Sequence, residues 1–280
     1  MYYLGPIVTW FVKQRVGAVR QMMDNPRDAQ RAVFNDLIQK AANTEWGKQH
    51  DFANIRTYDD FRSRMPVQDY DSLKPFIQRV MQGEQNVMWP TPIKWFSKSS
   101  GTTSDVSKFI PMSKESIEDC HYKVAQDLLA LYCDAYPDTN IFSGKALVLG
   151  GSHQVNQLNQ HSSYGDLSAV LLQNMSFIAQ MYRVPDLDIA LMDDWEQKIE
   201  RLAQSTVNEN ITNASGVPTW MMVLAKRLFD MTGKKTLREL WPEFELYIHG
   251  GVSFTPYRDH FKQIAGPGVR YLETYNASEG

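Results

Sequence analysis

The stretch FELYIHGGVSFTPYRDHFKQIAGPGVRYLETY, residues 244–275, predicts a strand, a helix and a second strand in that order. Its first apolar run ends at the pair Gly250-Gly251, a helix is expected over 256–264, and a second apolar run covers 269–275. A strand that is followed by a helix and a further strand is typical of parallel β-sheets. This stretch therefore favours an α/β fold.

The same alternation continues upstream of this stretch. Strands are expected over 93–96 and 146–149, and helices over 187–205 and from Pro218 to the stop signal Gly233. In sheets of this kind the loops at the carboxyl ends of the strands form the ligand crevice. We therefore expect an α/β fold with a largely parallel β-sheet flanked by helices, and a ligand site at one edge of that sheet.

Before residue 93 the chain shows helical patterns. Pro26 suits a first helical position, and further helices are expected over 59–65 and 70–81. We expect residues 1–92 to form a helical segment packed on an α/β core of residues 93–280. The apolar stripe of the helix that begins at Pro26 comprises Val33, Phe34, Leu37, Ile38 and Ala41.

Composition excludes several classes of protein. The chain has 280 residues, 43% hydrophobic and 22% charged, and a net charge of −3 without a basic cluster. These values exclude collagen-like, disordered and disulfide-framework proteins. They also make nucleic acid a poor partner, because binding phosphates requires clustered Lys and Arg. The length allows one large α/β domain or two smaller ones.

The two cysteines, Cys120 and Cys133, lie in one predicted helix that starts near Ser113. At about 1.5 Å per residue they are roughly 20 Å apart, too far for a disulfide. Unbridged thiols are typical of a reducing compartment, so a cytoplasmic protein is expected. The core stripe of this helix is expected to comprise Ile117, Cys120, Val124, Leu128 and Leu131.

An apolar stretch covers residues 2–12 and contains Gly5 and Pro6. It is shorter than the roughly 20 residues that span a bilayer, and it lacks the basic region and cleavage site of a signal peptide. We expect it to be an apolar arm docked on the protein.

The loop over residues 97–108, SKSSGTTSDVSK, combines small hydroxyl residues with one glycine and a lysine. Glycine allows the backbone to approach an anion, small side chains leave amide groups free, and a lysine neutralises charge. This composition suits a phosphate site, although it is not a Walker A loop. A flexible surface loop remains the alternative. The candidate binding residues are Ser99, Ser100, Gly101, Thr102, Thr103 and Lys108.

Two later strands end in comparable loops. The first contains Gly250, Gly251, Val252 and Ser253, where a flat ring can lie against exposed backbone. The second, residues 275–279, offers an aromatic face, small polar residues and a carboxylate able to hold Mg²⁺. A tight turn and a solvated loop are the respective alternatives. The second set comprises Tyr275, Asn276, Ala277, Ser278 and Glu279.

Other catalytic patterns are missing from the sequence. It contains no HExxH or CxxC metal motif and no GxSxG nucleophile elbow, and neither cysteine has neighbours that suggest a nucleophile. Covalent catalysis is therefore not supported.

Taken together and in order, the three loops resemble a known set of motifs. SSGTTSDVSKFIP (residues 99–111), HGGVSF (249–254) and YNASEG (275–280) are similar to the nucleotide motifs of the acyl-adenylate-forming superfamily, which includes firefly luciferase and acyl-CoA synthetases. The spacing from Ser99 to Lys108, followed by Ile-Pro, resembles the auxin-responsive acyl-acid amido synthetase family more specifically. The fold would then correspond to the large N-terminal domain of adenylate-forming enzymes.

The resemblance implies that ATP, with Mg²⁺, activates a small-molecule carboxylic acid as an acyl-adenylate, which an amino acid then converts to an amide. Ser100, Gly101, Thr102 and Thr103 would hold the β- and γ-phosphates with help from Lys108, and Ser99 precedes them. Gly250, Gly251, Val252 and Ser253 would line the adenine and ribose. Tyr275 would stack on adenine beside Asn276 and Ala277, Ser278 would approach the α-phosphate and the acyl carboxylate, and Glu279 would bind Mg²⁺.

Two departures from the family pattern keep alternatives open. Asp105 stands where the family usually has a small residue, and its carboxylate would repel a triphosphate. The family's ribose-binding aspartate and C-terminal domain with a catalytic lysine are not found up to Gly280, so we expect this chain to be an N-terminal portion that does not complete the reaction alone. An acyl- or aryl-CoA ligase is one alternative, and a degenerate, non-catalytic nucleotide- or acyl-binding protein is another.

The acyl pocket is expected between the first and second loops. An apolar site rich in Met and aromatic residues suits a hydrophobic or aromatic acid. The alternative is that these residues belong to the core. The candidates are Tyr164, Phe177, Met181 and residues 220–222.

Overall fold

The computed structural model describes residues 5–99, 107–151 and 155–279. The chain divides into two compact units. The boundary expected between residues 92 and 93 falls inside unit 2, where Phe96 packs with Ile77 and Val80 from the preceding helix. Unit 1 comprises Met1–Gln14, Leu128–Gln154 and Leu171–Ala277, and unit 2 comprises Arg15–Asp127, Val155–Val170 and Ser278–Gly280.

Unit 1 is built on a sheet of parallel strands in the order β6-β3-β7-β8-β9. The predicted strand, helix and strand of residues 244–275 form β8, α14 and β9, with His249 paired to Glu273 at the carboxyl end. The parallel sheet confirms the predicted α/β class. The strands are β3 (Lys145–Val148), β6 (Arg183–Val184), β7 (Ile211–Gly216), β8 (Leu246–His249) and β9 (Arg270–Glu273).

The helices of unit 1 follow their local signals, with one interruption. As predicted, α12 (Pro218–Thr232) begins with its proline and ends at Gly233, whose φ of 70° is left-handed. The single helix expected over 187–205 is divided into α10 (Leu187–Ala190) and α11 (Trp195–Thr206). The division arises because the Asp194 side chain accepts a hydrogen bond from the Gln197 amide and starts a new helix.

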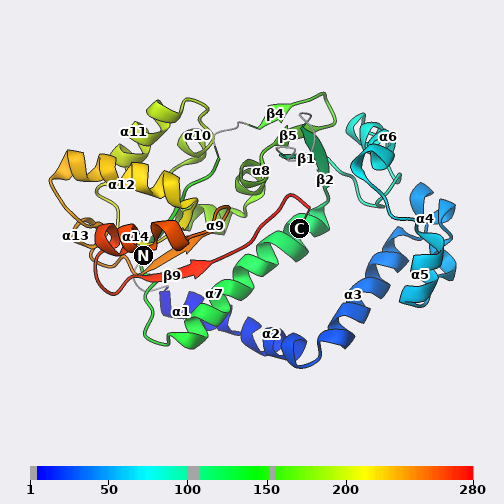
Figure 1. The fold of residues 1–280 in the computed structure, drawn as a ribbon, viewed down its shortest axis with the longest axis horizontal. Helices are drawn as coiled ribbons and strands as arrows, with labels where there is room; N and C mark the ends of the chain where they lie inside the picture. The colour runs from blue at the N-terminus through cyan, green and yellow to red at the C-terminus, as the bar shows by residue number, and fades with distance from the viewer. Residues whose placement is uncertain (1–4, 100–106, 152–154, 280) are drawn as a thin grey trace. The chain divides into compact units, whose positions relative to one another are not determined.

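The core of unit 1 lies between this sheet and its helices. Tyr247 on β8 stacks on Phe261 of α14 (Arg258–Ala265), with ring centroids 4.8 Å apart. Helices α11 and α12 lie side by side (Figure 1) and contribute buried leucines such as Leu202 and Leu224. The remaining elements are α9 (Phe177–Tyr182), α13 (Leu237–Leu240) and the 3-10 turn Thr255–Tyr257.

The apolar N-terminal stretch forms helix α1 (Gly5–Lys13). Gly5 is buried, and a Cβ there would lie 3.3 Å from the Phe142 carbonyl oxygen, so the start of the helix is docked as predicted. The face that carries Trp10 and Phe11 remains exposed. Across the described residues, no helix combines the length and the apolar character that crossing a membrane requires.

Unit 2 contains a second sheet, in the order β2-β1-β5-β4, that the sequence analysis did not predict. Only β1 was expected, and β1 is not part of the sheet that contains β8 and β9. The expectation that all three loops leave one sheet is therefore wrong. The new strands are short, and Pro111 weakens the strand signal of β2. The strands of this sheet are the expected β1 (Trp95–Ser99) and the new β2 (Lys108–Met112), β4 (Asn156–Gln157) and β5 (Ser163–Gly165).

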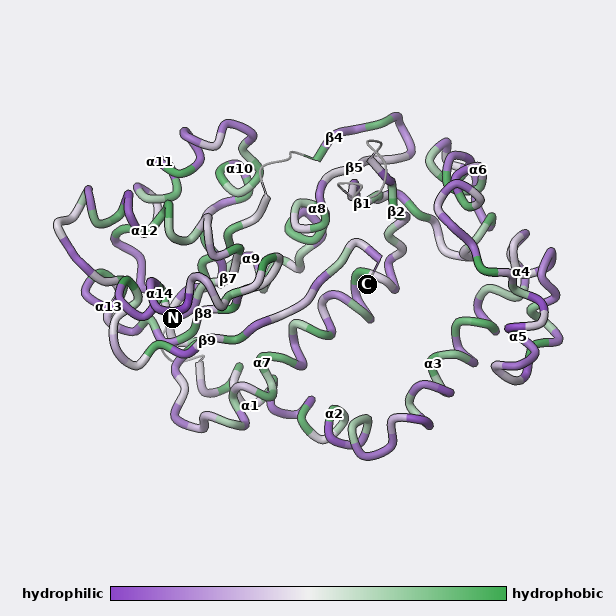
Figure 2. The backbone as a smooth tube through the Cα atoms, viewed as in Figure 1, coloured by the Kyte–Doolittle hydropathy of each residue, from purple (hydrophilic) through white to green (hydrophobic). Residues whose placement is uncertain are grey.

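The helices of unit 2 begin and end close to the predicted positions. Helix α6 covers Tyr70–Met81, as predicted, and Asp69 caps it. In α3 (Pro26–Ala41) the predicted stripe is too wide, because Val33 and Leu37 are exposed while Ile38 and Ala41 are buried. Figure 2 shows hydrophilic and hydrophobic residues alternating along α3. The other helices are α2 (Arg15–Asp24), α4 (Glu45–Gln49), the 3-10 turn Phe52–Asn54 and α5 (Tyr58–Arg64).

The helix predicted from Ser113 contains π-helical turns over Ser116–Tyr122 before it continues as α7 (Lys123–Ala135). A π turn takes one more residue than an α turn, so it rotates the residues that follow to a different face. The predicted core residue Val124 is consequently 58% exposed, while Tyr132 and Cys133 are buried. Cys120 and Cys133 are both free, as predicted. Helix α8 (Leu167–Asn174) completes the fold.

Candidate functional site

The predicted phosphate loop connects the two strands of an antiparallel hairpin. Ser99, the last residue of β1, pairs directly with Lys108, the first residue of β2. Lys108 therefore lies in a strand at the end of the loop, and not within the loop as expected. Ser100, Gly101, Thr102, Thr103 and Asp105 lie outside the described residues.

The Lys108 ammonium is held by an aromatic ring. Its Nζ atom lies 5.6 Å from the centroid of the Tyr70 ring, and the Tyr70 hydroxyl accepts a hydrogen bond of 2.8 Å from the Phe109 amide. Within the described part of the chain, Lys108 forms no ion pair with a carboxylate. A cation–π contact of this kind orients the ammonium without supplying an anionic partner.

Ser278 of the third motif lies against β1. Its hydroxyl is 2.9 Å from that of Ser97, and the two residues are 181 positions apart in sequence. Side chains alternate along a strand, so Ser97 and Ser99 share one face of β1, and Lys108 shares it as the pairing partner of Ser99. Two predicted binding residues, Ser99 and Lys108, are thus brought together with Ser278 on one face of a hairpin.

Ser97 was missed by the sequence analysis. It was expected at the start of the glycine-containing loop, but it lies in β1, between β2 and β5, and is fully buried. A serine at this position looks like one more small polar residue of the loop, and no local pattern shows that it faces Ser278. Its role depends on a contact that only the fold creates.

The second motif and the start of the third lie side by side at the carboxyl edge of the unit 1 sheet. The Thr274 amide donates a hydrogen bond of 2.7 Å to the carbonyl of His249. A Cβ atom on Gly250 would lie 2.4 Å from the Thr274 carbonyl oxygen, and Gly251 has a φ of 80°. Both glycines are therefore required, one by close packing of two backbones and the other by a left-handed conformation.

Several residues of the second and third motifs are exposed to solvent. Gly251, Val252 and Ser253 are exposed, and so are Asn276 and Glu279. Tyr275 is 86% exposed, so its ring is free on the surface of unit 1, and Ala277 and Ser278 are half-buried. An exposed aromatic ring beside open backbone is an arrangement on which a flat base can stack.

His249 is a buried imidazole at the same edge. It is 3% exposed and stacks on Phe254 with ring centroids 3.8 Å apart, and its Nδ1 atom is buried without a hydrogen-bond partner among the described residues. Burial lowers the pKa of His249, an effect to which Arg258 adds and which Glu273 opposes. Burial therefore favours the neutral form of the ring, which packs against Phe254 and Tyr247.

The described residues contain no cluster of three or more His, Cys, Asp or Glu side chains that could enclose a metal ion. Glu279, the predicted Mg²⁺ ligand, is an exposed single carboxylate. This fits Mg²⁺, because proteins commonly hold that ion through one or two carboxylates while phosphate oxygens and water supply the other ligands. It does not fit a metal enclosed by protein side chains alone.

The predicted acyl-pocket residues fall into different environments. Phe177, 77% exposed, and Met181 lie on the open surface of α9, and these two are not core residues. Met221 is fully buried in unit 1, so it belongs to the core, against which Trp220 and Met222 also pack. Tyr164 packs in unit 2 against Phe109.

The structure also contains a buried lysine that the sequence analysis missed. Lys198 on α11 is 1% exposed, and its Nζ atom donates hydrogen bonds to the carbonyl oxygens of Gly150 and Gly151 at 3.3 and 2.6 Å. These glycines follow β3 at the carboxyl edge of the sheet. A lysine in the segment WEQKIERL suggests a solvated position, so no sequence signal marks it as buried.

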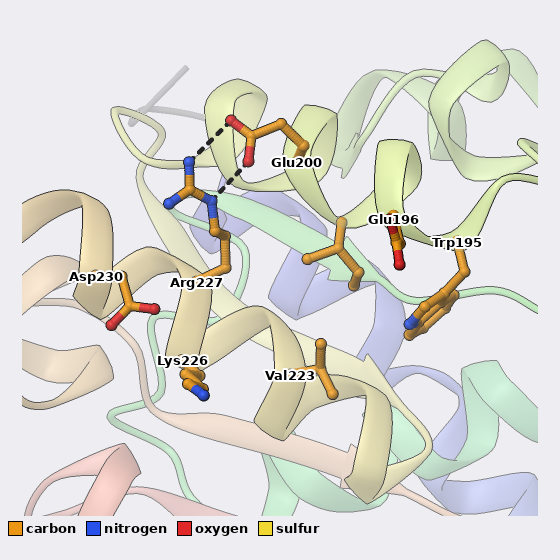
Figure 3. A pocket seen from close by; sticks show the side chains of 8 residues that line it. Trp195, Glu196, Glu200, Val223, Lys226, Arg227 and Asp230 are labelled. Carbon is orange, nitrogen blue, oxygen red and sulfur yellow. Dashed lines mark hydrogen bonds and ion pairs between the residues drawn. The ribbon is translucent and has the colours of Figure 1, made fainter.

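A shallow pocket of about 300 Å³ lies between α11 and α12 (Figure 3). Its wall contains a bidentate ion pair, with Arg227 nitrogens 2.6 and 3.0 Å from the Glu200 oxygens, and Trp195 closes one end. None of the predicted site residues lines it. It is therefore separate from the candidate site.

Comparisons with known proteins agree with the resemblance found in the sequence. Residues 15–269 match the family model described as the GH3 family N-terminal domain. The indole-3-acetic acid-amido synthetase GH3.2 of Arabidopsis thaliana is 30% identical over 117 residues, which cover 41% of this chain and 21% of that protein. GH3.4, an indole-3-acetic acid-amido synthetase of the same plant, is 31% identical over 100 residues, or 35% of this chain and 17% of that protein.

Solved structures show the same fold. A GH3.15 acyl acid amido synthetase superposes with a TM-score of 0.74 at 17% identity, covering 95% of this chain and 56% of that one. A 2-hydroxyisobutyryl-CoA ligase in complex with 2-HIB-AMP and CoA superposes with a TM-score of 0.52 at 12% identity, covering 90% and 53%. At these identities the likeness concerns the fold.

The matches cover about a fifth of the curated relatives and little more than half of the solved chains. The family match, by contrast, extends over most of this chain, from α2 to the residue before β9. The predicted resemblance and the predicted fold are both confirmed, and this chain belongs to the GH3 family, whose N-terminal domain its residues 15–269 match.

Proposed function

We propose that this protein uses ATP to activate a carboxylic acid as an acyl-adenylate and then transfers the acyl group to the amine of an amino acid. The observation that carries this proposal is the Ser97–Ser278 contact, which brings Ser278 onto the face of the hairpin that bears Ser99 and Lys108. The names of the curated relatives, which are amido synthetases acting on indole-3-acetic acid, support the class of reaction.

The first step suits these residues chemically. A carboxylate oxygen of the acid attacks the α-phosphorus of ATP, a new C(O)–O–P bond forms, and the bond to pyrophosphate breaks. Negative charge moves onto the pyrophosphate, so positioned donors and a cation are needed where that charge develops. Lys108 supplies the cation at the mouth of the loop, and Ser278 supplies a hydroxyl donor. The role of Ser100, Gly101, Thr102 and Thr103 in holding the phosphates stays a prediction.

The adenosine would lie along the open edge of unit 1. Gly250, Gly251, Val252 and Ser253 offer exposed or closely packed backbone, and Tyr275 offers a free ring. Proteins commonly hold a base with one face of its ring against glycine backbone and the other face against an aromatic side chain. Asn276 and Ala277 follow Tyr275 in the same segment of unit 1.

Glu279 would hold Mg²⁺ together with phosphate oxygens. Bound there, the ion supplies charge neutralisation on the triphosphate. The carboxylate is exposed and follows Ser278 directly, so it can serve a metal bound to the same phosphates that Ser278 and Lys108 contact.

In the second step the amine attacks the carbonyl carbon of the acyl-adenylate, an amide bond forms, and AMP leaves. An apolar acid is favoured, because Phe177 and Met181 expose apolar surface on α9. An acyl- or aryl-CoA ligase shares the first step, and the fold likeness to a CoA ligase keeps it as the second candidate.

The proposal is tested by ATP–pyrophosphate exchange with the complete protein and a panel of aliphatic and aromatic carboxylic acids. We expect exchange that depends on the acid and that falls at least tenfold in Lys108→Ala and Ser278→Ala. The absence of exchange with every acid would refute it. Amide formation with amino acids, compared with thioester formation with coenzyme A, then separates the two candidates.

A non-catalytic binding protein makes a different prediction. If the Asp105 carboxylate has made the phosphate loop a weak ATP site, Asp105→Gly should increase ATP affinity in a calorimetric titration. Unchanged affinity together with acid-dependent exchange by the unmodified protein would exclude the degenerate alternative.

A further inference from the structure

We propose that Ser97 is a positioning residue for the adenylation step, acting by holding the hydroxyl of Ser278 in place. This inference rests on the proposed function and adds a residue to it that lies in none of the three recognised motifs. The geometry consists of one hydrogen bond of 2.9 Å between the two hydroxyls, both in unit 2.

Ser97 has a rigid setting. It lies in β1, an inner strand of its sheet, where it pairs with Ile110 of β2 on one side and with Gly165 of β5 on the other. Its side chain is completely buried, and the neighbouring Phe96 packs into the core on the opposite face. A side chain held by two strands and by burial gives its partner a fixed reference point.

Ser278 has a less constrained setting. It is half-buried in the turn that follows the irregular residues 274–277, and it precedes the exposed Glu279. A serine hydroxyl in such a turn would otherwise rotate among three staggered positions. The hydrogen bond to Ser97 selects one of them, so the hydroxyl is oriented before any ligand binds.

The direction of the hydrogen bond also matters. Either serine hydroxyl can donate in this pair, and in the arrangement in which Ser97 donates to Ser278 the Ser278 proton is free to be donated to an anionic oxygen. Donation by Ser97 also polarises the second hydroxyl and makes it a better donor. In this series of hydrogen bonds, Ser97 orients Ser278, and the Ser278 hydroxyl proton then points at the phosphate or carboxylate oxygen on which negative charge develops.

The test is a double-mutant cycle on the complete protein, measured as ATP–pyrophosphate exchange. Ser278→Ala should lower turnover about 100-fold, the typical cost of removing one positioned donor. Ser97→Ala should lower turnover about 5- to 10-fold, the usual value of one hydrogen bond, with little change in the KM for ATP. In the Ser278→Ala background, Ser97→Ala should have no further effect, because there is no longer a hydroxyl to position.

Two variants separate positioning from general stability. Ser162→Ala is the matched control, because Ser162 is also a buried serine of unit 2 and its hydroxyl donates to the Met81 carbonyl. It should lower the melting temperature and leave exchange unchanged. Ser97→Thr keeps a hydroxyl in the strand and should restore exchange to within about threefold of the unmodified protein. If Ser97→Ala does not fold, Ser97→Cys takes its place in the cycle.

The possible results are distinct. The positioning role would be overturned if Ser97→Ala lowered exchange by the same factor in the unmodified protein and in Ser278→Ala. It would also be overturned if the Ser97→Ala protein kept full exchange activity. The proposed function would stand in both cases. Failure of the unmodified protein to catalyse exchange with any acid would overturn both.

Discussion

The ammonium of Lys198 lies 2.6 Å from the carbonyl oxygen of Gly151, and Lys198 is almost completely buried. Helix α11 thereby supplies a hydrogen-bond donor to the backbone carbonyl groups that follow β3, at the carboxyl edge of the unit 1 sheet. A charged group in this position stabilises the protein only while its partners remain in place, because a buried charge without partners costs several kcal/mol.

Replacement of Lys198 should therefore destabilise the protein. Lys198→Met removes the donor of both hydrogen bonds to the Gly150 and Gly151 carbonyl groups and should lower the free energy of unfolding by about 1–3 kcal/mol in urea titration. Lys226→Ala, at an exposed position on α12, is the control and should change it by less than about 0.5 kcal/mol. A Lys198→Met protein as stable as the control would show that the contact has no net value.

Gly250→Ala should damage both stability and the candidate site. The new Cβ atom would lie 2.4 Å from the Thr274 carbonyl oxygen, so the segment that leads to Tyr275 must shift. We expect a loss of about 1–3 kcal/mol in urea titration and at least a tenfold loss of exchange activity.

Gly17→Ala is the matched control for this substitution. Gly17 lies within helix α2, and a Cβ there would meet no atom within 4 Å. The change should stabilise the protein by about 0.5–1 kcal/mol, because alanine is the better helix former, and it should leave exchange unchanged. Equal effects of the two substitutions would contradict the packing argument.

His249 should make stability depend on pH. Its pKa is lowered by burial in the folded protein, so the unfolded chain binds the proton more tightly. The contribution of the neutral ring is present above the ordinary pKa of about 6.5 and is lost as the pH falls below it. We expect the free energy of unfolding to decrease between pH 7 and pH 5.

Variants at two histidines test this assignment. His249→Phe keeps a flat ring against Phe254 and removes the titrating group, so the decrease between pH 7 and pH 5 should become smaller. His260→Gln, at an exposed position on α14, should leave it unchanged. The same pH dependence in His249→Phe as in the unmodified protein would exclude His249 as its source.

The Glu245 carboxylate contacts four polar residues of unit 1. Its carboxylate accepts hydrogen bonds from the hydroxyls of Tyr132 and Thr139 and from the Asn140 amide, and it forms an ion pair of 3.5 Å with Arg270. Glu245→Ala should lower the free energy of unfolding by about 2–4 kcal/mol, measured in urea, because the buried Tyr132 hydroxyl and two further donors lose one shared acceptor.

The exposed pair Asp259–Lys262 provides the comparison for Glu245. Asp259→Ala removes a surface ion pair of 3.2 Å and should cost less than about 1 kcal/mol. If the two variants lose similar stability, burial is not what gives Glu245 its effect.

Much of the local structure was predictable because its signals lie within a few residues. Helix α6 has the predicted bounds because Asp69 caps its start, and α12 begins at Pro218 and ends at Gly233. The β8, α14 and β9 series follows from two apolar runs around one helical run. In each case backbone geometry and hydrogen bonding within one segment are sufficient.

Other features were not predictable from such signals. The π-helical turns of Ser116–Tyr122 shifted the buried face so that Val124 is exposed. Strand β2 contains Pro111, and β4 and β5 are only two and three residues long, so their pairing with β1 and with each other gives them their structure. A segment that gains its hydrogen bonds from distant residues carries little evidence of them in its own sequence.

The sequence by itself determined the parallel α/β class, the family and the identity of three loops that carry small, polar and charged residues, because these depend on residue type and short-range order. Only the tertiary structure decided that β1 joins a second sheet, that Lys108 stands opposite Ser99, and that Ser97 reaches Ser278. The physical reason is that Ser97 and Ser278 are 181 positions apart in sequence. A hydrogen bond between them forms only when tertiary packing brings the two residues together.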